Sequence, residues 1–343
     1  MKPKPRHITL FTLLICVWLM MIFTSLAEGY ARGIYPFISR LLSTVSLPFS
    51  FSLSDCFIYG SIAGLIVYLV IAICRHKKFK KILLVEGEYL LWVYVWFYLA
   101  WGINYYRKDF YTRADVVKTE FSDVAFQKFL SVYADSLEFT CCNIQRIDTV
   151  YLDRLVKESY SDLSTKYGIL SPRTALHSKP MLLNRLMSGV GVLGYLGPFF
   201  NEYTLNKELL PVQYPFTYAH EMAHVLGVAE EAEANLYAYL ICTNSSNRAL
   251  RFSGYFGLLP SVLINIQGLY GKKAAKDWFA TLSPSVKAVY HQDREYWDSR
   301  SYPLLNDFQD ALYNLYLKGN NIDSGLDDYS EVIGMVMALR ENN

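Results

Sequence analysis

The sequence carries little charge and few cysteines. Only 19% of its 343 residues are charged, and the net charge is +2. Nucleic-acid binding depends on clustered Lys and Arg, and no basic patch with interleaved aromatic residues follows the first third of the chain, so no nucleic-acid partner is expected. The six cysteines have neither zinc-ribbon spacing nor the pattern of a disulfide framework. One pairing, of Cys242 with Cys141 or Cys142, stays open.

The chain also lacks internal repeats, low-complexity segments and long linkers after about residue 107. Residues 107–343 are numerous enough to form one domain with its own core. The glycine-rich segment at residues 188–198 lacks the Lys-Ser/Thr ending and the spacing of a phosphate loop. A nucleotide site of that kind is therefore excluded.

Long apolar runs, by contrast, fill the first third of the chain. They cover about residues 7–27, 57–74 and 82–103, and each approaches the length that spans a bilayer. Glu86 and Glu88 lie near the start of the third run. Because the first run is long for a signal peptide and further runs follow, we predict an uncleaved anchor. The sequence thus predicts a membrane domain, residues 1–106, with three transmembrane helices.

Basic residues predict how these spans are oriented. They precede the first span and fill the loop between the second and third, whereas the loop at residues 28–55 holds only Arg32 and Arg40. The positive-inside rule places the N-terminus and the basic loop in the cytoplasm. Three spans then place residues 107–343 outside it, in the periplasm of a cell with two membranes. The apolar run at residues 252–269 is interrupted by Pro260 and is predicted to be a core helix.

The segment His220-Glu221-Met222-Ala223-His224 is the most specific motif in the chain. Two histidines four residues apart lie on one face of a helix, where both can bind one Zn²⁺. The glutamate between them then serves as the general base for a water that the metal activates. Pro215 before the motif and Gly227 after it are the residues expected at the two ends of such a helix. The alternative is an ordinary helix that happens to carry two histidines.

A catalytic zinc needs a third protein ligand and an open position. The acidic residues that follow the motif offer two candidates. Glu233, at the start of a second helix, is the preferred third ligand, and Glu230 is the alternative. Asn235 on the same helix is a candidate to hold one of the histidines through its second ring nitrogen.

The remaining segments predict a helix-rich domain with a small β element. Aromatic residues and Thr at 199–206 favour a strand, and residues 195–206 are a candidate rim that binds an extended substrate. An oxyanion donor could be Tyr237, His291 or Tyr329. Helices are predicted at residues 125–139, 150–167, 274–280, 284–298, 304–317 and 330–340.

Several motifs together resemble an uncharacterised bacterial membrane-protein family, domain of unknown function 3810. These are the block from Met187 to Glu202, the segment from Pro215 to Gly227, Glu233-Ala234-Asn235, and the end of the third apolar run at Trp101–Arg107. Two short motifs near the C-terminus, Tyr316–Lys318 and Asp328–Ser330, are also similar. The resemblance implies a multi-pass protein of the bacterial inner membrane with a zinc-peptidase domain, and it implies no substrate.

The sequence therefore predicts a mainly α (α+β) protein, with three N-terminal spans followed by a zincin-like domain. The expected function is zinc-dependent hydrolysis of peptides or proteins of the cell envelope, with Glu221 as base and His220, His224 and Glu233 as ligands. Two alternatives remain: a non-catalytic module stabilised by zinc, and a zinc amidase acting on a small or cell-wall substrate. The lipid bilayer is the other expected partner.

Overall fold

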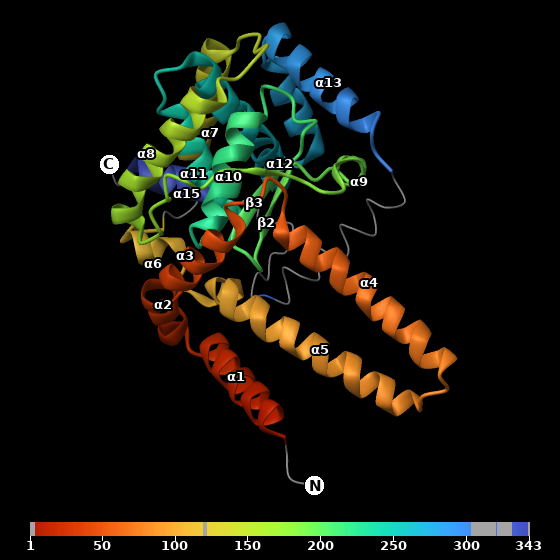
Figure 1. Cartoon of the computed structure of the whole chain (residues 1–343). Coiled ribbons are helices and arrows are strands. Elements are labelled where there is room, and N and C mark those ends of the chain that lie inside the picture. Colours follow the sequence, from red (N-terminus) through yellow and green to blue (C-terminus); the bar gives the residue numbers. More distant parts are fainter. Residues whose placement is uncertain (1–3, 119–121, 303–319, 321–330, 342–343) are drawn as a thin grey trace.

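The fold is helical around one small sheet. The computed structural model describes residues 4–118, 122–302, 320 and 331–341. In these ranges the chain is mainly helical and has one three-stranded sheet, as the sequence predicted. Figure 1 shows a helical body from which three N-terminal helices extend on one side.

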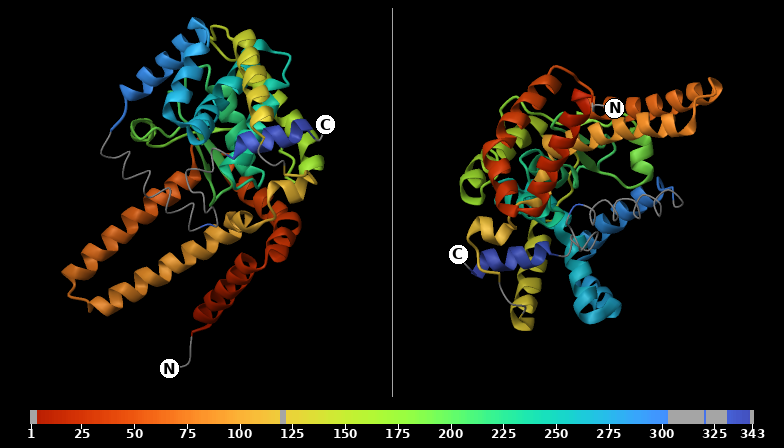
Figure 2. Two further views of the ribbon diagram at one scale, coloured as in Figure 1. Left: turned by 180° about the vertical axis from the view of Figure 1, so that it is seen from behind. Right: turned by 90° about the horizontal axis from the view of Figure 1, so that it is seen from below.

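The three extended helices correspond to the predicted apolar runs, except that the first ends at Ile22 and residues 24–27 begin another helix, because Phe23 has an extended backbone. They are α1 (Pro5–Ile22), α4 (Leu53–Cys74) and α5 (Phe79–Ala100), each long and apolar enough to cross a membrane. Only 11%, 6% and 17% of their apolar windows are buried in the protein. The start of α1 and the turn between α4 and α5 both lie at the end remote from the body (Figures 1 and 2). On α5, Glu88 is ion-paired with Arg6 of α1 at 2.9 Å.

A fourth helix meets the same criteria of length and composition. This helix is α12 (Arg248–Thr281), which contains Pro260 and is interrupted at Gly271, where φ is +88°. More than half of its apolar window, 56%, is buried inside the protein. It packs against α7 (Asp123–Thr140), α10 (Tyr214–Val225) and α11 (Glu231–Thr243). This degree of burial is typical of a helix inside the body, as predicted for residues 252–269.

Short helices connect these elements. They are α2 (Thr24–Gly33), α3 (Tyr35–Ser46), the 3-10 helix η1 (Gly102–Tyr106), α6 (Phe110–Ala114), α8 (Thr149–Tyr167), α9 (Asn184–Gly189), α13 (Pro284–Asp298) and α15 (Val332–Glu341). The predicted helices at 125–139, 150–167, 284–298 and 330–340 are confirmed by α7, α8, α13 and α15. The predicted helix at 274–280 is part of α12, and the one at 304–317 lies outside the described residues.

The sheet has the order β1-β3-β2. β1 (Lys179–Pro180) runs parallel to β3 (Glu202–Leu205), and β2 (Gly194–Gly197) pairs antiparallel with β3. The strand predicted at 199–206 corresponds to β3. In the described part of the chain β2 is an edge strand, with one side of its backbone unpaired.

Two apolar clusters hold the body together. The larger one surrounds α10, α11 and α12. The smaller one joins the ends of the N-terminal helices to the turn between α10 and α11, and its buried members are Val17, Ala27, Tyr30, Ala31, Tyr35, Tyr98, Trp101, Ile103 and Ala229. The α10–α11 turn therefore rests directly on the ends of α1, α3 and α5.

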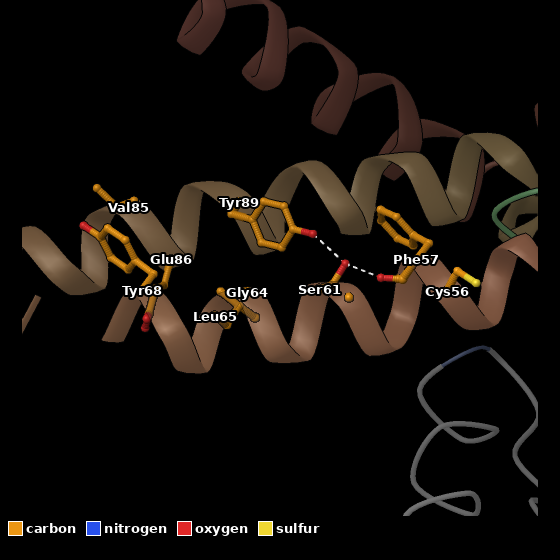
Figure 3. A pocket seen from close by; sticks show the side chains of 10 residues that line it. Cys56, Phe57, Ser61, Gly64, Leu65, Tyr68, Val85, Glu86 and Tyr89 are labelled. Carbon is orange, nitrogen blue, oxygen red and sulfur yellow. Dashed lines mark hydrogen bonds between the residues drawn. The ribbon is translucent and has the colours of Figure 1, made fainter. Parts of the chain in front are cut away.

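A groove of about 460 Å³ lies between α4 and α5 (Figure 3). Small residues of α4, among them Gly60 and Gly64, face Glu86 and Tyr89 of α5, and the hydroxyl of Tyr89 donates to Ser61 Oγ at 2.6 Å. The groove is lined only by residues of these two helices. It is therefore separate from the histidines of the sequence motif.

Candidate metal centre

The two histidines of the motif lie on one face of α10. This helix starts with Pro215 in its first turn and is followed by Gly227, where φ is +91°, a conformation that favours glycine. One helical turn separates His220 from His224, and their Nε2 atoms are 3.1 Å apart. Two imidazoles in this arrangement can share one metal ion.

Each histidine is oriented through its other ring nitrogen. Nδ1 of His220 lies 2.9 Å from Oδ1 of Asn235, and Nδ1 of His224 lies 2.8 Å from the carbonyl oxygen of Val228. Both partners are acceptors, so each histidine donates through Nδ1, and a metal ion bound at Nε2 would require that nitrogen to be deprotonated. Asn235 thus contacts the second ring nitrogen of a histidine of the motif, as predicted.

A buried carboxylate completes the group of ligand atoms. Oε2 of Glu231, the first residue of α11, lies 3.2 Å from Nε2 of His220 and 3.7 Å from Nε2 of His224. The ligand atoms of the three residues all lie within 4.8 Å of one another. Burial alone would lower the pKa of His224, but the charge of Glu231 raises it to about 9. Although burial opposes it, His224 in turn holds the pKa of Glu231 well below its ordinary value.

The structure does not bring Glu233, the third ligand predicted from the sequence, to the histidines. Its carboxylate is ion-paired with Arg113 and accepts a hydrogen bond from the Tyr237 hydroxyl at 2.6 Å. Side chains two residues apart on a helix point about 200° away from each other. Glu231 and Glu233 therefore face opposite sides of α11. The alternative candidate, Glu230, is the N-cap residue of α11 and is not in the group of converging ligand atoms.

Glu221, the predicted base, is buried beside this group. Among the described residues its Oε2 atom has no hydrogen-bond partner. Burial raises the pKa of its carboxyl to about 7, against the charges of His220 and His224, which lower it. A buried carboxylate oxygen without a partner is costly, and a water molecule at the centre would satisfy it.

The residues present fit a catalytic zinc ion. Two imidazoles and one carboxylate are a donor set that catalytic zinc uses, leaving a position for water or substrate. The unpartnered oxygen of Glu221 belongs to a side chain buried beside this donor set. His220 is the most exposed of the three candidate ligands, with 12% of its side chain accessible.

The edge strand β2 lies directly against Glu221. A Cβ atom on Gly194 would lie 2.5 Å from Oε1 of Glu221, so the backbone of β2 approaches the carboxylate as closely as a glycine permits. The sequence prediction placed a substrate-binding rim at residues 195–206. The structure puts the start of β2, at Gly194, next to the predicted base.

Strand β2 is held in place by a buried polar cluster at the start of α4. The Tyr195 hydroxyl donates to Asp55 at 2.8 Å, and Oε1 of Glu202 accepts from the backbone N–H of Ser54 at 2.6 Å. Lys179 Nζ donates to Oε2 of Glu202 at 2.6 Å and to the carbonyl oxygen of Ser46. Lys179 of β1 is thus ion-paired with Glu202 of β3, and Asp55 of α4 is held by hydrogen bonds, among them the one from Tyr195.

The candidate oxyanion donors do not gather at this centre. The Tyr237 hydroxyl is used by Glu233, and the His291 ring contacts Phe279 and Tyr290. Tyr329 lies outside the described residues. All six cysteines are free thiols, including Cys242, Cys141 and Cys142, so the open disulfide pairing does not form in this structure.

Sequence reasoning missed two residues that shape the centre. The sequence favours Glu233, whereas Glu231 lies on the face of α11 that meets the histidines. Trp101, at the end of α5, donates its indole N–H to the carbonyl oxygen of His224 at 2.7 Å. No sequence signal links Trp101 to the motif, because 123 residues separate the two.

The comparisons with known proteins identify a family. Residues 30–337, a range that includes the whole centre, match the family described as "Protein of unknown function (DUF3810)". The chain belongs to this family. The predicted resemblance is thereby confirmed, while the family description specifies no activity. Neither the curated proteins nor the solved structures gave a match.

In this DUF3810 protein, a methyl group at position 194 is expected to impair the centre without emptying it. Gly194→Ala would displace the Glu221 carboxylate, and misplacing a reacting group by about 1 Å can cost about 100-fold in rate. If this centre hydrolyses peptides with a bound zinc ion, we expect kcat to fall by about 10–100-fold with unchanged zinc content. Gly268→Ala is the matched control, because a Cβ there meets nothing within 4 Å. Equal activity of the two variants would refute the close approach.

Proposed function

We propose that this protein is a membrane-anchored, zinc-dependent peptidase. His220, His224 and Glu231 would hold the metal, and Glu221 would act as the general base. One observation carries the proposal: a buried carboxylate oxygen without a partner among the described residues lies beside two imidazoles whose Nε2 atoms converge with a second carboxylate.

Each side chain has a defined task in this reaction. Zn²⁺, when bound, supplies Lewis acidity that polarises the substrate carbonyl and acidifies a water molecule. Glu221 accepts a proton from the attacking water and returns it to the leaving amine. Burial raises the pKa of this carboxyl, which favours uptake of the proton from water.

The edge of β2 supports a peptide substrate. An extended peptide can pair with an open strand edge through its own backbone, and such pairing would draw a scissile bond past Gly194 and Glu221. A non-catalytic zinc module is less well supported, since it gives no reason to bury an unpaired carboxylate beside the ligands. A zinc amidase would use the same centre and is distinguished by its substrate.

The proposed anchor consists of α1, α4 and α5 as three membrane spans. Basic residues lie at the ends of these helices that are remote from the body. Lys4 and Arg6 are at the start of α1, and the basic run from Arg75 to Lys81 joins α4 to α5. By the positive-inside rule these ends are cytoplasmic, and the metal centre is extracytoplasmic. A reporter fused after Asn343 is expected to be active only outside the cytoplasm, and a cytoplasmic signal would overturn this orientation.

Metal removal tests the proposed activity. The detergent-purified protein is incubated with a randomised peptide mixture, and products are identified by mass spectrometry. We expect cleavage that falls to the background rate after chelation and returns when one equivalent of Zn²⁺ is added. Zinc-dependent release of ammonia from small amides, without peptide cleavage, would support the amidase instead. Bound zinc with neither activity would favour the binding module.

A further inference from the structure

We infer that the substrates are polypeptides anchored in the same bilayer, cut within the first few residues that leave the membrane surface. The inference rests on the proposed peptidase function and adds the class of substrate. Two sets of contacts between the body and the N-terminal helices, together with the exposed surface of α3, support it.

The first contact seats the metal-binding helix on the N-terminal helices. Trp101, which directly follows α5, donates its indole N–H to the His224 carbonyl oxygen at 2.7 Å. Tyr35 of α3 is fully buried, and its hydroxyl donates to the Val225 carbonyl oxygen at 2.8 Å. Two backbone carbonyls at the C-terminal end of α10 are thus held by residues that adjoin the membrane. The centre cannot move far from the bilayer without breaking both contacts.

The second contact seats β2 on the start of α4. Alternate residues of a strand face opposite sides, and β2 uses both sides. Gly194 faces Glu221, whereas Tyr195 binds Asp55 and a Cβ atom on Gly197 would lie 2.5 Å from Ser54 Oγ. The strand therefore runs from the proposed base to the first turn of α4.

The turn after β2 contacts the membrane helices. The ring of Phe199 lies 4.6 Å from that of Phe57 on α4, and the ring of Phe200 lies 5.7 Å from that of Trp96 on α5. Gly194 and Gly197 are three residues apart, which is about 10 Å along an extended strand. A substrate paired with β2 would therefore reach the apolar part of the bilayer after about three to five residues.

The third observation is the surface of α3, which buries its serines and exposes apolar side chains. Its exposed face carries an apolar stripe, with Phe37 at 76% exposure and Leu41 at 65%, flanked by Ile34 and Val45, and the exposed Arg40 and Thr44 border this stripe. The occupant we assign to this stripe is bilayer lipid, because α3 lies in the chain between the membrane helices α1 and α4 and next to their body-side ends (Figure 2). Helices with one apolar face lie in the membrane interface in this way.

The polar side of α3 is fixed toward the body, so the apolar stripe cannot turn inward. Ser39 accepts a hydrogen bond from Asn201, and Ser43 accepts one from Arg173 at 2.8 Å. The Ser46 carbonyl oxygen accepts from Lys179. A second exposed apolar patch, of Leu182, Leu183 and Leu186, adjoins the start of α4, where the Leu182 N–H donates to Asp55.

These contacts hold the centre at a fixed, short height above the bilayer. A segment that emerges from the membrane beside the protein can pair with β2 in its extended form, while a loop far from the membrane cannot approach the centre as readily. Proximity and orientation then favour cleavage of membrane-anchored segments. A soluble, folded protein would be a poor substrate.

The test uses anchored peptides in vesicles that also contain the zinc-loaded protein. Each peptide has an apolar helix of about 20 residues and a randomised cassette placed either about 4 or about 20 residues from it, in both chain orientations. Both peptides share one bilayer and hence one surface concentration. We expect the near cassette to be cut about tenfold faster or more. Equal or faster cutting of the distant cassette would overturn the inference.

A matched pair of variants tests the part played by α3. Phe37→Asp places a charge in the apolar stripe and is expected to reduce the ratio of near to distant cutting at least about threefold, because a charge is costly in the interface. Phe139→Asp is the control, since Phe139 has 75% exposure at the end of α7, remote from the membrane helices. The same change in both variants would contradict membrane seating by α3.

Failure of this inference differs from failure of the proposed function. If neither cassette nor free peptide is cut by the zinc-loaded protein, the peptidase proposal fails. If free peptides and both cassettes are cut equally, the peptidase stands and the membrane-anchored substrate class is wrong.

Discussion

Replacing Glu221 by Gln is expected to lower the rate of peptide hydrolysis by about 10²–10⁴-fold, the usual contribution of a general base. The amide keeps the shape of the side chain but cannot accept the proton of the attacking water. Since Glu221 is not among the converging ligand atoms, zinc content should stay the same as in the unchanged protein. The measurement is kcat on a peptide found to be cleaved, with metal analysis of the same sample.

Two comparisons make this result specific. Glu208→Gln, at an acidic residue outside the ligand group, serves as the control and should leave kcat within about twofold. If Glu221→Gln retained full activity, Glu221 would not be the base, whatever the metal content. If it lost both zinc and activity, its carboxylate would be needed to build the site, and its role as a base would lose support.

Replacing Arg113 by Met is expected to cost about 3–5 kcal/mol of stability, because it leaves the buried charge of Glu233 without its ion-pair partner. Both side chains are almost fully buried, at 4% and 2% exposure. Thermal unfolding in detergent should show a clearly lowered midpoint. A double-mutant cycle with Glu233→Gln should show that the two changes are coupled by about 0.5–3 kcal/mol.

This prediction separates the structural role of Glu233 from a ligand role. Combining Arg113→Met with Glu233→Gln should destabilise less than the sum of the two single changes. Strictly additive effects would contradict the ion pair. Arg185→Met, on the short helix α9 and in no ion pair of the described residues, is a suitable control and should change stability by about 0.5 kcal/mol or less.

Local patterns made much of the site predictable. The spacing of His220 and His224 determines their common face, because four residues make about one helical turn. Pro215 and Gly227 marked the ends of the helix for reasons of backbone geometry alone. The apolar runs were equally readable, since the length needed to cross a bilayer does not depend on contacts elsewhere.

The third ligand depended on contacts that sequence does not display. Glu231 and Glu233 have the same chemistry and lie on one helix, and only its rotation decides which of them faces the histidines. Arg113 helps to set that rotation, and it lies 120 residues from Glu233. Likewise, nothing local joins Trp101 to His224 or Tyr35 to Val225. The position of the centre against the membrane helices therefore required the structure.

Zinc content in two glutamate variants tests the central claim most directly. Wild-type protein, Glu231→Gln and Glu233→Gln are purified in detergent without chelator, and zinc per chain is measured on the folded fraction. We predict about one zinc in the wild type and in Glu233→Gln, and little or none in Glu231→Gln. Retention of zinc in Glu231→Gln with its loss in Glu233→Gln, or no zinc in the wild type, would contradict the account.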